Sequence, residues 1–140
     1  MKDIKIGLAG FGTVGRGTWE LLEKNREKIE RSSKIKISIV AVADPDNSKF
    51  KSVDIHSACH VYSDAFQLLN DKSIDIVIEL IGGETIAKEF VIAALKERKT
   101  VVTANKALLA KHGKQIFNEA ERNGAAVFYE AAIAGGIPIV

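Results

Sequence analysis

Residues 4–24, "IKIGLAGFGTVGRGTWELLEK", decide the fold of this chain. They join a short apolar run, residues 4–9, to a charged segment through three glycines, Gly10, Gly12 and Gly15. Glycine is a poor residue in both strands and helices, so its spacing at this junction needs a physical reason. The pattern G-x-G-x-x-G between a predicted strand and a predicted helix is typical of a dinucleotide-binding turn. A purely structural glycine turn is the alternative.

Each glycine has a separate task in a dinucleotide-binding turn. Gly10 makes the tight bend, Gly12 lets the backbone approach a pyrophosphate, and Gly15 allows the helix to pack closely on the strand. The free N–H groups and the dipole of the following helix then hold the anion. The turn therefore predicts cofactor binding.

Predicted strands and helices alternate along the whole chain. The apolar patterns predict strands at residues 4–9, 37–43, 60–63, 75–80, 100–104 and 126–130. They predict helices at residues 14–31, 63–69 (capped by Ser63), 85–98 and 105–122, with Gly113 as a candidate break in the last. This alternation implies a parallel sheet with helices on both faces. Six strands with a glycine turn after the first predict a doubly wound, Rossmann-type α/β fold with strand order 3-2-1-4-5-6.

Length and composition are those of one globular domain. The chain has 140 residues, 46% of them hydrophobic and 27% charged, and a net charge of +2 that predicts no nucleic-acid partner. No apolar run approaches a membrane span, and the single cysteine, Cys59, fits a reducing cytoplasm. The chain stops in an apolar stretch, residues 131–140, whereas domains usually end at solvated segments. We therefore expect a fragment whose next element has been cut away.

Two further segments are expected at the edge of the sheet where the strands end. Asp44 follows the second strand, where a ribose-binding carboxylate belongs, although it is also a plausible turn residue before Pro45. "ELIGG", residues 79–83, follows the fourth strand. Gly82 and Gly83 either let the backbone lie against a nicotinamide ring or only make the turn.

The segment "TVVTANKALLA", residues 100–110, places Lys106 directly after a buried strand. A cation at this edge can orient a polar substrate or meet a developing oxyanion. The alternative is an ordinary solvated lysine.

The last segment, "YEAAIAGGIPIV", combines the Glu130 carboxylate with an extended glycine-containing loop. Such a loop can cage a hard cation with its carbonyl oxygens, or it can be a linker that bends at its two glycines. His56, Cys59 and His60 lie close together, but no further cysteine completes a closed site, so we expect no metal there.

Four segments together resemble the amino-terminal, nucleotide-binding part of homoserine dehydrogenase over nearly the entire chain. They are "GLAGFGTVGRGTWELLEKN", "ELIGG", "VVTANKALLA" and "YEAAIAGGIPIV". The resemblance implies interconversion of L-homoserine and L-aspartate 4-semialdehyde with NAD or NADP, in threonine, methionine and isoleucine biosynthesis.

The resemblance also implies roles for particular residues. At the cofactor-contacting turn, the matching residues are Phe11, Thr13 and Val14. Lys106 matches a lysine near the nicotinamide and the substrate. Glu130, with the backbone carbonyls of Ile133, Gly135 and Ile137, matches a monovalent-cation site for sodium.

The chain departs from the family in its extent. Family members continue into a substrate and dimerisation domain that supplies a second catalytic lysine and an acidic residue. Residues 1–140 are thus expected to be an NAD(P)-binding domain truncated before that domain, inactive alone, from a cytoplasmic homo-oligomer. A different amino-acid dehydrogenase with the same cofactor domain and a stand-alone nucleotide-sensing module stay open as alternatives.

Cofactor choice is indicated by the residue before Asp44. Many family members have a basic residue there, which can meet a 2′-phosphate, whereas this chain has Ala43. A carboxylate accepts a hydrogen bond from a ribose hydroxyl but repels a phosphate. We therefore expect NAD to be preferred, by a modest margin because Lys49 and Lys51 can fold back.

Overall fold

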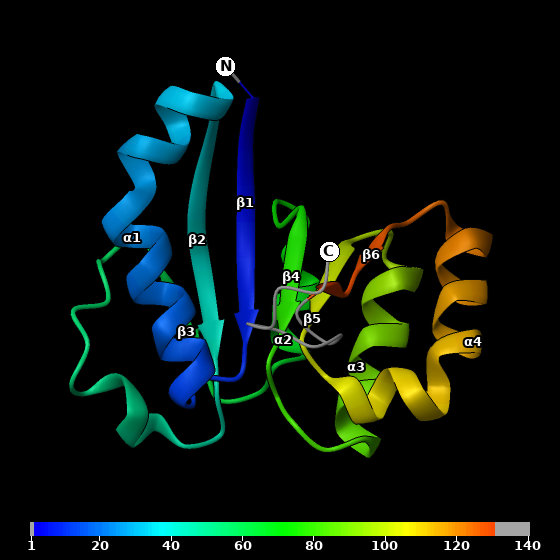
Figure 1. The fold of residues 1–140 in the computed structure, drawn as a ribbon. Coiled ribbons are helices and arrows are strands. Elements are labelled where there is room, and N and C mark those ends of the chain that lie inside the picture. Colours follow the sequence, from blue (N-terminus) through cyan, green and yellow to red (C-terminus); the bar gives the residue numbers. More distant parts are fainter. Residues whose placement is uncertain (1, 131–140) are drawn as a thin grey trace.

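The chain forms a six-stranded parallel sheet in the computed structural model, which describes residues 2–130. The strands follow the order β3-β2-β1-β4-β5-β6, and every neighbouring pair is parallel (Figure 1). The strands are β1 (Lys2–Ala9), β2 (Ile35–Ala43), β3 (His60–Tyr62), β4 (Ile76–Glu79), β5 (Thr100–Thr103) and β6 (Val127–Phe128). The helices are α1 (Thr13–Ser33), α2 (Gln67–Asn70), α3 (Thr85–Lys96) and α4 (Lys106–Asn123), with a 3-10 turn at Asn47–Phe50. The predicted fold and strand order are confirmed.

Two separate apolar cores lie on the two faces of the sheet. Successive strand residues point to opposite faces, so the central strands contribute to both cores. Leu8 and Val42 pack with Trp19 of α1 in one core. Ala41 faces the other core, which the helices α2, α3 and α4 complete. Figure 1 shows α1 and the α3–α4 pair on separate sides of the strands.

The helix α1 is longer than the predicted segment 14–31. It ends at Ser33, and its C-cap Lys34 adopts a left-handed conformation with φ 60° and donates its N–H to the Glu30 carbonyl. Among residues 2–130, no helix has the length and apolar composition needed to cross a bilayer.

Two predicted helix features are wrong. The helix expected from Ser63 begins only at Gln67, because Asp64 makes a turn by accepting the Phe66 N–H on its side chain. The candidate break at Gly113 does not occur, and α4 is continuous. One glycine costs a helix only about 1 kcal/mol, and α4 buries an apolar face in the core that it shares with α3.

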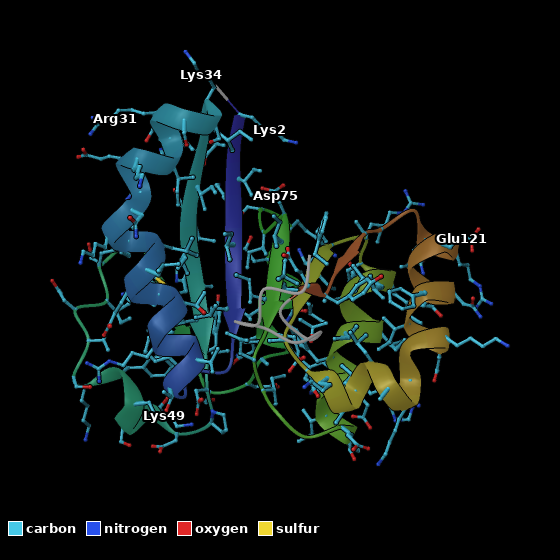
Figure 2. The ribbon with its side chains drawn as sticks, viewed as in Figure 1. Lys2, Arg31, Lys34, Lys49, Asp75 and Glu121 are labelled. Atoms are coloured by element: carbon cyan, nitrogen blue, oxygen red, sulfur yellow. The ribbon has the colours of Figure 1, made fainter. Side chains whose placement is uncertain are left out.

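The amino edge of the sheet contains a buried lysine, Lys99. Its ammonium donates to the carbonyl oxygens of Asp71 at 2.7 Å and Ile74 at 2.9 Å, which joins β5 to the loop before β4. Burial lowers the pKa of Lys99, because desolvation disfavours the charged form. Lys2 and Asp75 lie at the same edge as Lys99. Figure 2 shows both of them far from Lys49, which lies at the carboxyl edge.

Candidate cofactor-binding site

The glycine turn between β1 and α1 allows backbone contacts that a side chain would prevent. Gly10 has φ +96°, and a Cβ there would lie 2.3 Å from the Leu80 carbonyl oxygen. A Cβ on Gly15 would lie 2.2 Å from the Gly10 carbonyl oxygen. At Gly12, in contrast, a Cβ would meet nothing within 4 Å. Packing therefore explains Gly10 and Gly15, and the open space at Gly12 leaves room for a ligand to approach the backbone.

The N-terminus of α1 is suited to an anion. Gly12 at the N-cap provides no side-chain hydrogen bond, the first turn has no acidic residue, and the first helical residues, Thr13 and Val14, are exposed. The N-terminus of α4 is different, because the Asn105 side chain accepts the Leu108 N–H at 3.0 Å. The first N–H groups of α1 are thus left for a ligand, and the positive end of the helix dipole favours a negative one.

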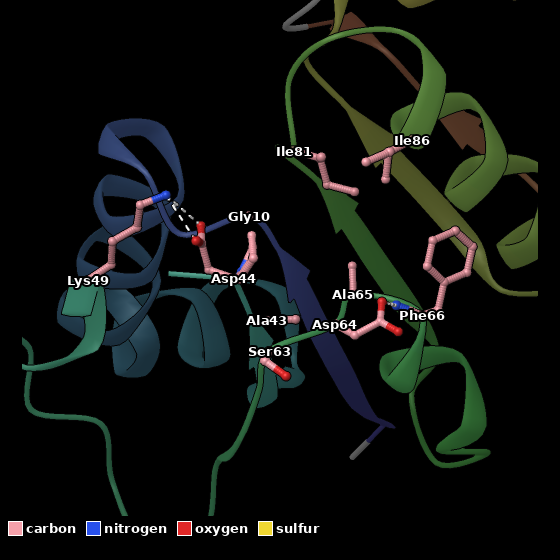
Figure 3. Close-up of a pocket in the computed structure, with 11 residues that line it drawn as sticks. Gly10, Ala43, Asp44, Lys49, Ser63, Asp64, Ala65, Phe66, Ile81 and Ile86 are labelled. Carbon is pink, nitrogen blue, oxygen red and sulfur yellow. Dashed lines mark hydrogen bonds and ion pairs between the residues drawn. The ribbon is translucent and has the colours of Figure 1, made fainter. Parts of the chain in front are cut away.

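Asp44 is a buried carboxylate beside the glycine turn, only 4% exposed. It accepts the backbone N–H of Phe11 at 2.8 Å and that of Asp46 at 2.9 Å. The Lys49 ammonium bridges both of its oxygens, at 2.9 and 3.0 Å (Figure 3). Burial by itself raises the pKa of Asp44, but the hydrogen bonds from Phe11, Lys49 and Asp46 outweigh it and hold the pKa below its ordinary value. Asp44 is therefore a turn residue whose carboxylate borders a cleft, and Lys49 does fold back onto it.

A first cleft of about 310 Å³ opens beside Asp44. Gly10 and Ala43 lie at its base, and Figure 3 shows Ile81, Ile86 and Phe66 across from the Asp44–Lys49 pair. Its lining residues are Gly10, Ala43, Asp44, Pro45, Lys49, Ser63, Asp64, Ala65, Phe66, Ile81 and Ile86. The cleft thus combines apolar walls with a few charged groups, the Asp44–Lys49 pair and Asp64, as a site for a base and its ribose requires.

A second cleft, of about 280 Å³, brings together residues from three of the predicted segments. Val14 comes from the glycine turn, Gly82 from "ELIGG", and Lys106 from the start of α4. Lys106 is exposed, and within residues 2–130 it makes no ion pair. The carboxyl ends of β1, β4 and β5 therefore place these residues around one space.

The backbone of the "ELIGG" turn has an unusual conformation. Gly82 and Gly83 have φ +79° and +69°, which side-chain-bearing residues rarely adopt. The Gly83 carbonyl accepts a hydrogen bond from the Asn105 side chain at 2.6 Å. This bond ties the turn after β4 to the N-cap of α4, directly next to Lys106.

Glu79 is a site residue that the sequence analysis missed. It is fully buried at the end of β4, lines the second cleft, and accepts hydrogen bonds from the Ile81 N–H and the Thr103 hydroxyl. The available signal was an acidic residue within an apolar strand, "DIVIEL".

The predicted cation loop falls largely outside the described residues. Glu130 is exposed at their end, while Ile133, Gly135 and Ile137 lie beyond them. Between residues 2 and 130, no three His, Cys, Asp or Glu side chains form a group that could hold a metal ion. Cys59 is buried, and desolvation, with the charge of Glu23, raises the pKa of its thiol to about 12.

The fold and the edge clefts define a class of protein. A doubly wound sheet binds dinucleotides beyond the carboxyl ends of its central strands, where the strand order reverses between β1 and β4. Here that position holds an uncapped helix N-terminus between two clefts. The chain is a Rossmann-type dinucleotide-binding domain.

Comparisons with known proteins identify the family. Residues 10–130 match the family model described as "Homoserine dehydrogenase, NAD binding domain", and the chain belongs to this family. Homoserine dehydrogenases from Neisseria gonorrhoeae and Pseudomonas aeruginosa are 46% and 44% identical to it over its whole length. The crystal structure of a homoserine dehydrogenase from Thiobacillus denitrificans superposes with a TM-score of 0.90 at 44% identity, covering 99% of this chain and 32% of that one.

The chain spans about a third of the relatives that it matches. It covers 32% of both curated sequences, although each of them covers all of it. The family match therefore concerns the cofactor-binding part of these proteins.

Proposed function

We propose that this chain is the cofactor-binding part of a homoserine dehydrogenase, which interconverts L-homoserine and L-aspartate 4-semialdehyde with NAD or NADP. One observation carries the proposal: the uncapped N-terminus of α1, the "ELIGG" turn and Lys106 meet at one edge of the sheet. The identity of 44–46% to homoserine dehydrogenases supports the choice of substrate.

The residues of the chain have distinct parts in the proposed reaction. The turn Gly10–Gly15 would hold the pyrophosphate through its backbone, with Phe11 and Thr13 at the bend, and Asp44 would hold the ribose. Gly82 and Gly83 would lie against the nicotinamide, and the bound cofactor would supply the hydride acceptor for the alcohol carbon of homoserine. Lys106 orients the polar substrate and stabilises negative charge on its reacting oxygen. A base outside this chain removes the hydroxyl proton.

The part of the relatives' sequence that this chain does not cover is proposed to supply the base and the rest of the substrate site. That remainder carries the substrate and dimerisation domain, and the whole enzyme is a cytoplasmic homo-oligomer. Sodium is proposed to bind at Glu130 and the carbonyls that follow it. Replacing sodium chloride by choline chloride in the assay of the whole enzyme tests that site, since choline is too large for such a cage.

NAD is proposed as the better cofactor, by about tenfold in kcat/KM, or about 1.4 kcal/mol. The Asp44 carboxylate borders the first cleft and disfavours a 2′-phosphate, while the Lys49 ammonium reduces that repulsion. Asp44→Ala is expected to shrink the ratio of kcat/KM for the two cofactors. A wild-type preference for NADP would contradict this role of Asp44.

The decisive experiment uses the full-length protein. Reduction of NAD by L-homoserine is measured at 340 nm, alongside other amino-acid alcohols and with no substrate. Oxidation of homoserine above the other alcohols supports the proposal. Turnover of a different alcohol indicates another dehydrogenase, and cofactor binding without any turnover indicates a nucleotide-sensing module.

A further inference from the structure

Glu79 places a carboxyl group in the interior, where the proposed reaction has no use for it as an acid or base. It is 0% exposed, and no cation of residues 2–130 lies within ion-pair distance of it. Its Oε1 accepts the Ile81 N–H at 2.9 Å, and its Oε2 accepts the Thr103 hydroxyl at 2.6 Å. An apolar residue could fill this position without the cost of burying a carboxylate, so packing alone does not explain Glu79.

The hydrogen bonds continue from Thr103 to the start of α4. The Thr103 oxygen accepts the backbone N–H of Asn105 at 3.1 Å, so its own hydrogen is directed to Glu79. The Asn105 side chain donates to the Gly83 carbonyl and accepts the Leu108 N–H. The bonds therefore form a closed ring that runs from the end of β4 to the N-cap of α4 and back to the "ELIGG" turn.

This ring connects the two walls of the second cleft. Gly82 lies on one wall, between Ile81 and Gly83, and Lys106 lies on the other, next to Asn105. A Cβ at Gly82 or Gly83 would meet nothing within 4 Å, so little packing holds this turn in place. The Glu79–Thr103 bond is buried and the rest of the ring extends from it toward the surface. A satisfied polar network anchored in the interior fixes the spacing of the groups attached to it.

We propose that Glu79 is a positioning residue: through Ile81 and Thr103 it sets the distance between the Gly82 turn and Lys106, and so fixes the nicotinamide and substrate end of the site. This inference rests on the proposed function for the identity of that end. Glu79 borders the second cleft, but its side chain is fully buried and its two oxygens accept hydrogen bonds from Ile81 and Thr103, so it acts through the ring.

The ring requires that both terminal atoms of side chain 79 accept a hydrogen bond. The Ile81 N–H can only donate, and the Thr103 hydroxyl has no other acceptor within the ring. A glutamine has one oxygen and one NH₂ group, so it meets one of these donors with a donor of its own. Glu79→Gln therefore preserves size and breaks one link of the ring.

The test uses the full-length protein and two probes, NADH and ADP-ribose, which has the dinucleotide without the nicotinamide. Glu79→Gln and Thr103→Val are both expected to weaken NADH binding about fivefold and to lower kcat at least about tenfold, because misplaced groups are costly. ADP-ribose affinity should stay within about twofold, and Thr103→Ser, which keeps the hydroxyl, should stay within about threefold of wild type in kcat. The double variant Glu79→Gln/Thr103→Val should lose less than the sum of the two single losses, since both changes disturb the same ring.

Lys99→Met is the matched control for lost stability. It removes a buried polar group of comparable connectivity at the opposite edge of the sheet. It should lower the melting temperature without changing kcat or the ratio of the two dissociation constants.

The proposal is overturned if Glu79→Gln lowers only the melting temperature, or weakens NADH and ADP-ribose equally. If the wild-type protein does not oxidise homoserine, the proposed function fails. The ratio of NADH to ADP-ribose affinity then still decides whether Glu79 positions the nicotinamide end.

Discussion

Replacing Gly12 by alanine should separate cofactor binding from folding. Gly12 has φ −75°, which alanine adopts readily, and its Cβ would meet no protein atom within 4 Å. The cost to stability is that of a poorer N-cap, about 0.5 kcal/mol. The methyl group would instead occupy the space in which the pyrophosphate approaches the backbone.

The loss of affinity follows from the hydrogen bonds that this methyl group blocks. One hydrogen bond to a charged group contributes about 1.5–3 kcal/mol. Losing one such bond raises the dissociation constant by about 10- to 150-fold. Calorimetric titration of NADH into the full-length Gly12→Ala protein measures this change, and urea denaturation measures stability in parallel. An unchanged dissociation constant in a folded variant would refute pyrophosphate binding at this turn.

Two alanine variants in the same helix provide the controls. In Gly15→Ala the new Cβ would lie 2.2 Å from the Gly10 carbonyl oxygen, so stability and binding should fall together. Gly17 has open space around its Cβ position, so Gly17→Ala should stabilise the protein by about 0.5–1 kcal/mol and leave NADH binding unchanged. A loss of binding in Gly17→Ala would show that the assay reports a disturbed helix.

Three further results are expected. Lys106→Ala in the full-length enzyme should lower kcat/KM at least about tenfold, since a charge-assisted contact contributes about 1.5–3 kcal/mol; unchanged kinetics would make Lys106 an ordinary surface lysine. The lowered pKa of Asp44 stabilises the fold fully above its unfolded pKa of about 3.9, and this stabilisation is lost as the pH falls toward the folded pKa. Wild type should therefore lose more stability than Asp44→Asn between about pH 4 and 2, and parallel acid-unfolding curves would contradict the pairing. Cys59 should resist a thiol reagent at pH 8 in the folded chain and react once denatured, because burial raises its pKa to about 12; rapid labelling of the native chain would show that the thiol is accessible.

The order of the strands could be predicted because its signals are local. Apolar periodicity distinguishes strands from helices, and the glycine spacing after the first strand selects a doubly wound order. Helix boundaries were harder to predict, because neighbouring residues such as Ser63 and Asp64 can each cap a helix or make a turn. Asp64 rather than Ser63 makes the turn before α2, and the packed face of α4 outweighs Gly113.

The sequence by itself determined the fold class, the glycine turn and the segments that meet at the carboxyl edge. Only the tertiary structure decided how their side chains are connected. The pairing of Lys49 with Asp44 depends on the path of a loop, and the bond from Glu79 to Thr103 joins residues 24 apart in the chain. Such bonds depend on which strands are neighbours and on their register, and β4 and β5 align Glu79 directly with Thr103. A pattern along one segment reports the burial of that segment, but it does not report which atom of another segment lies within hydrogen-bond distance.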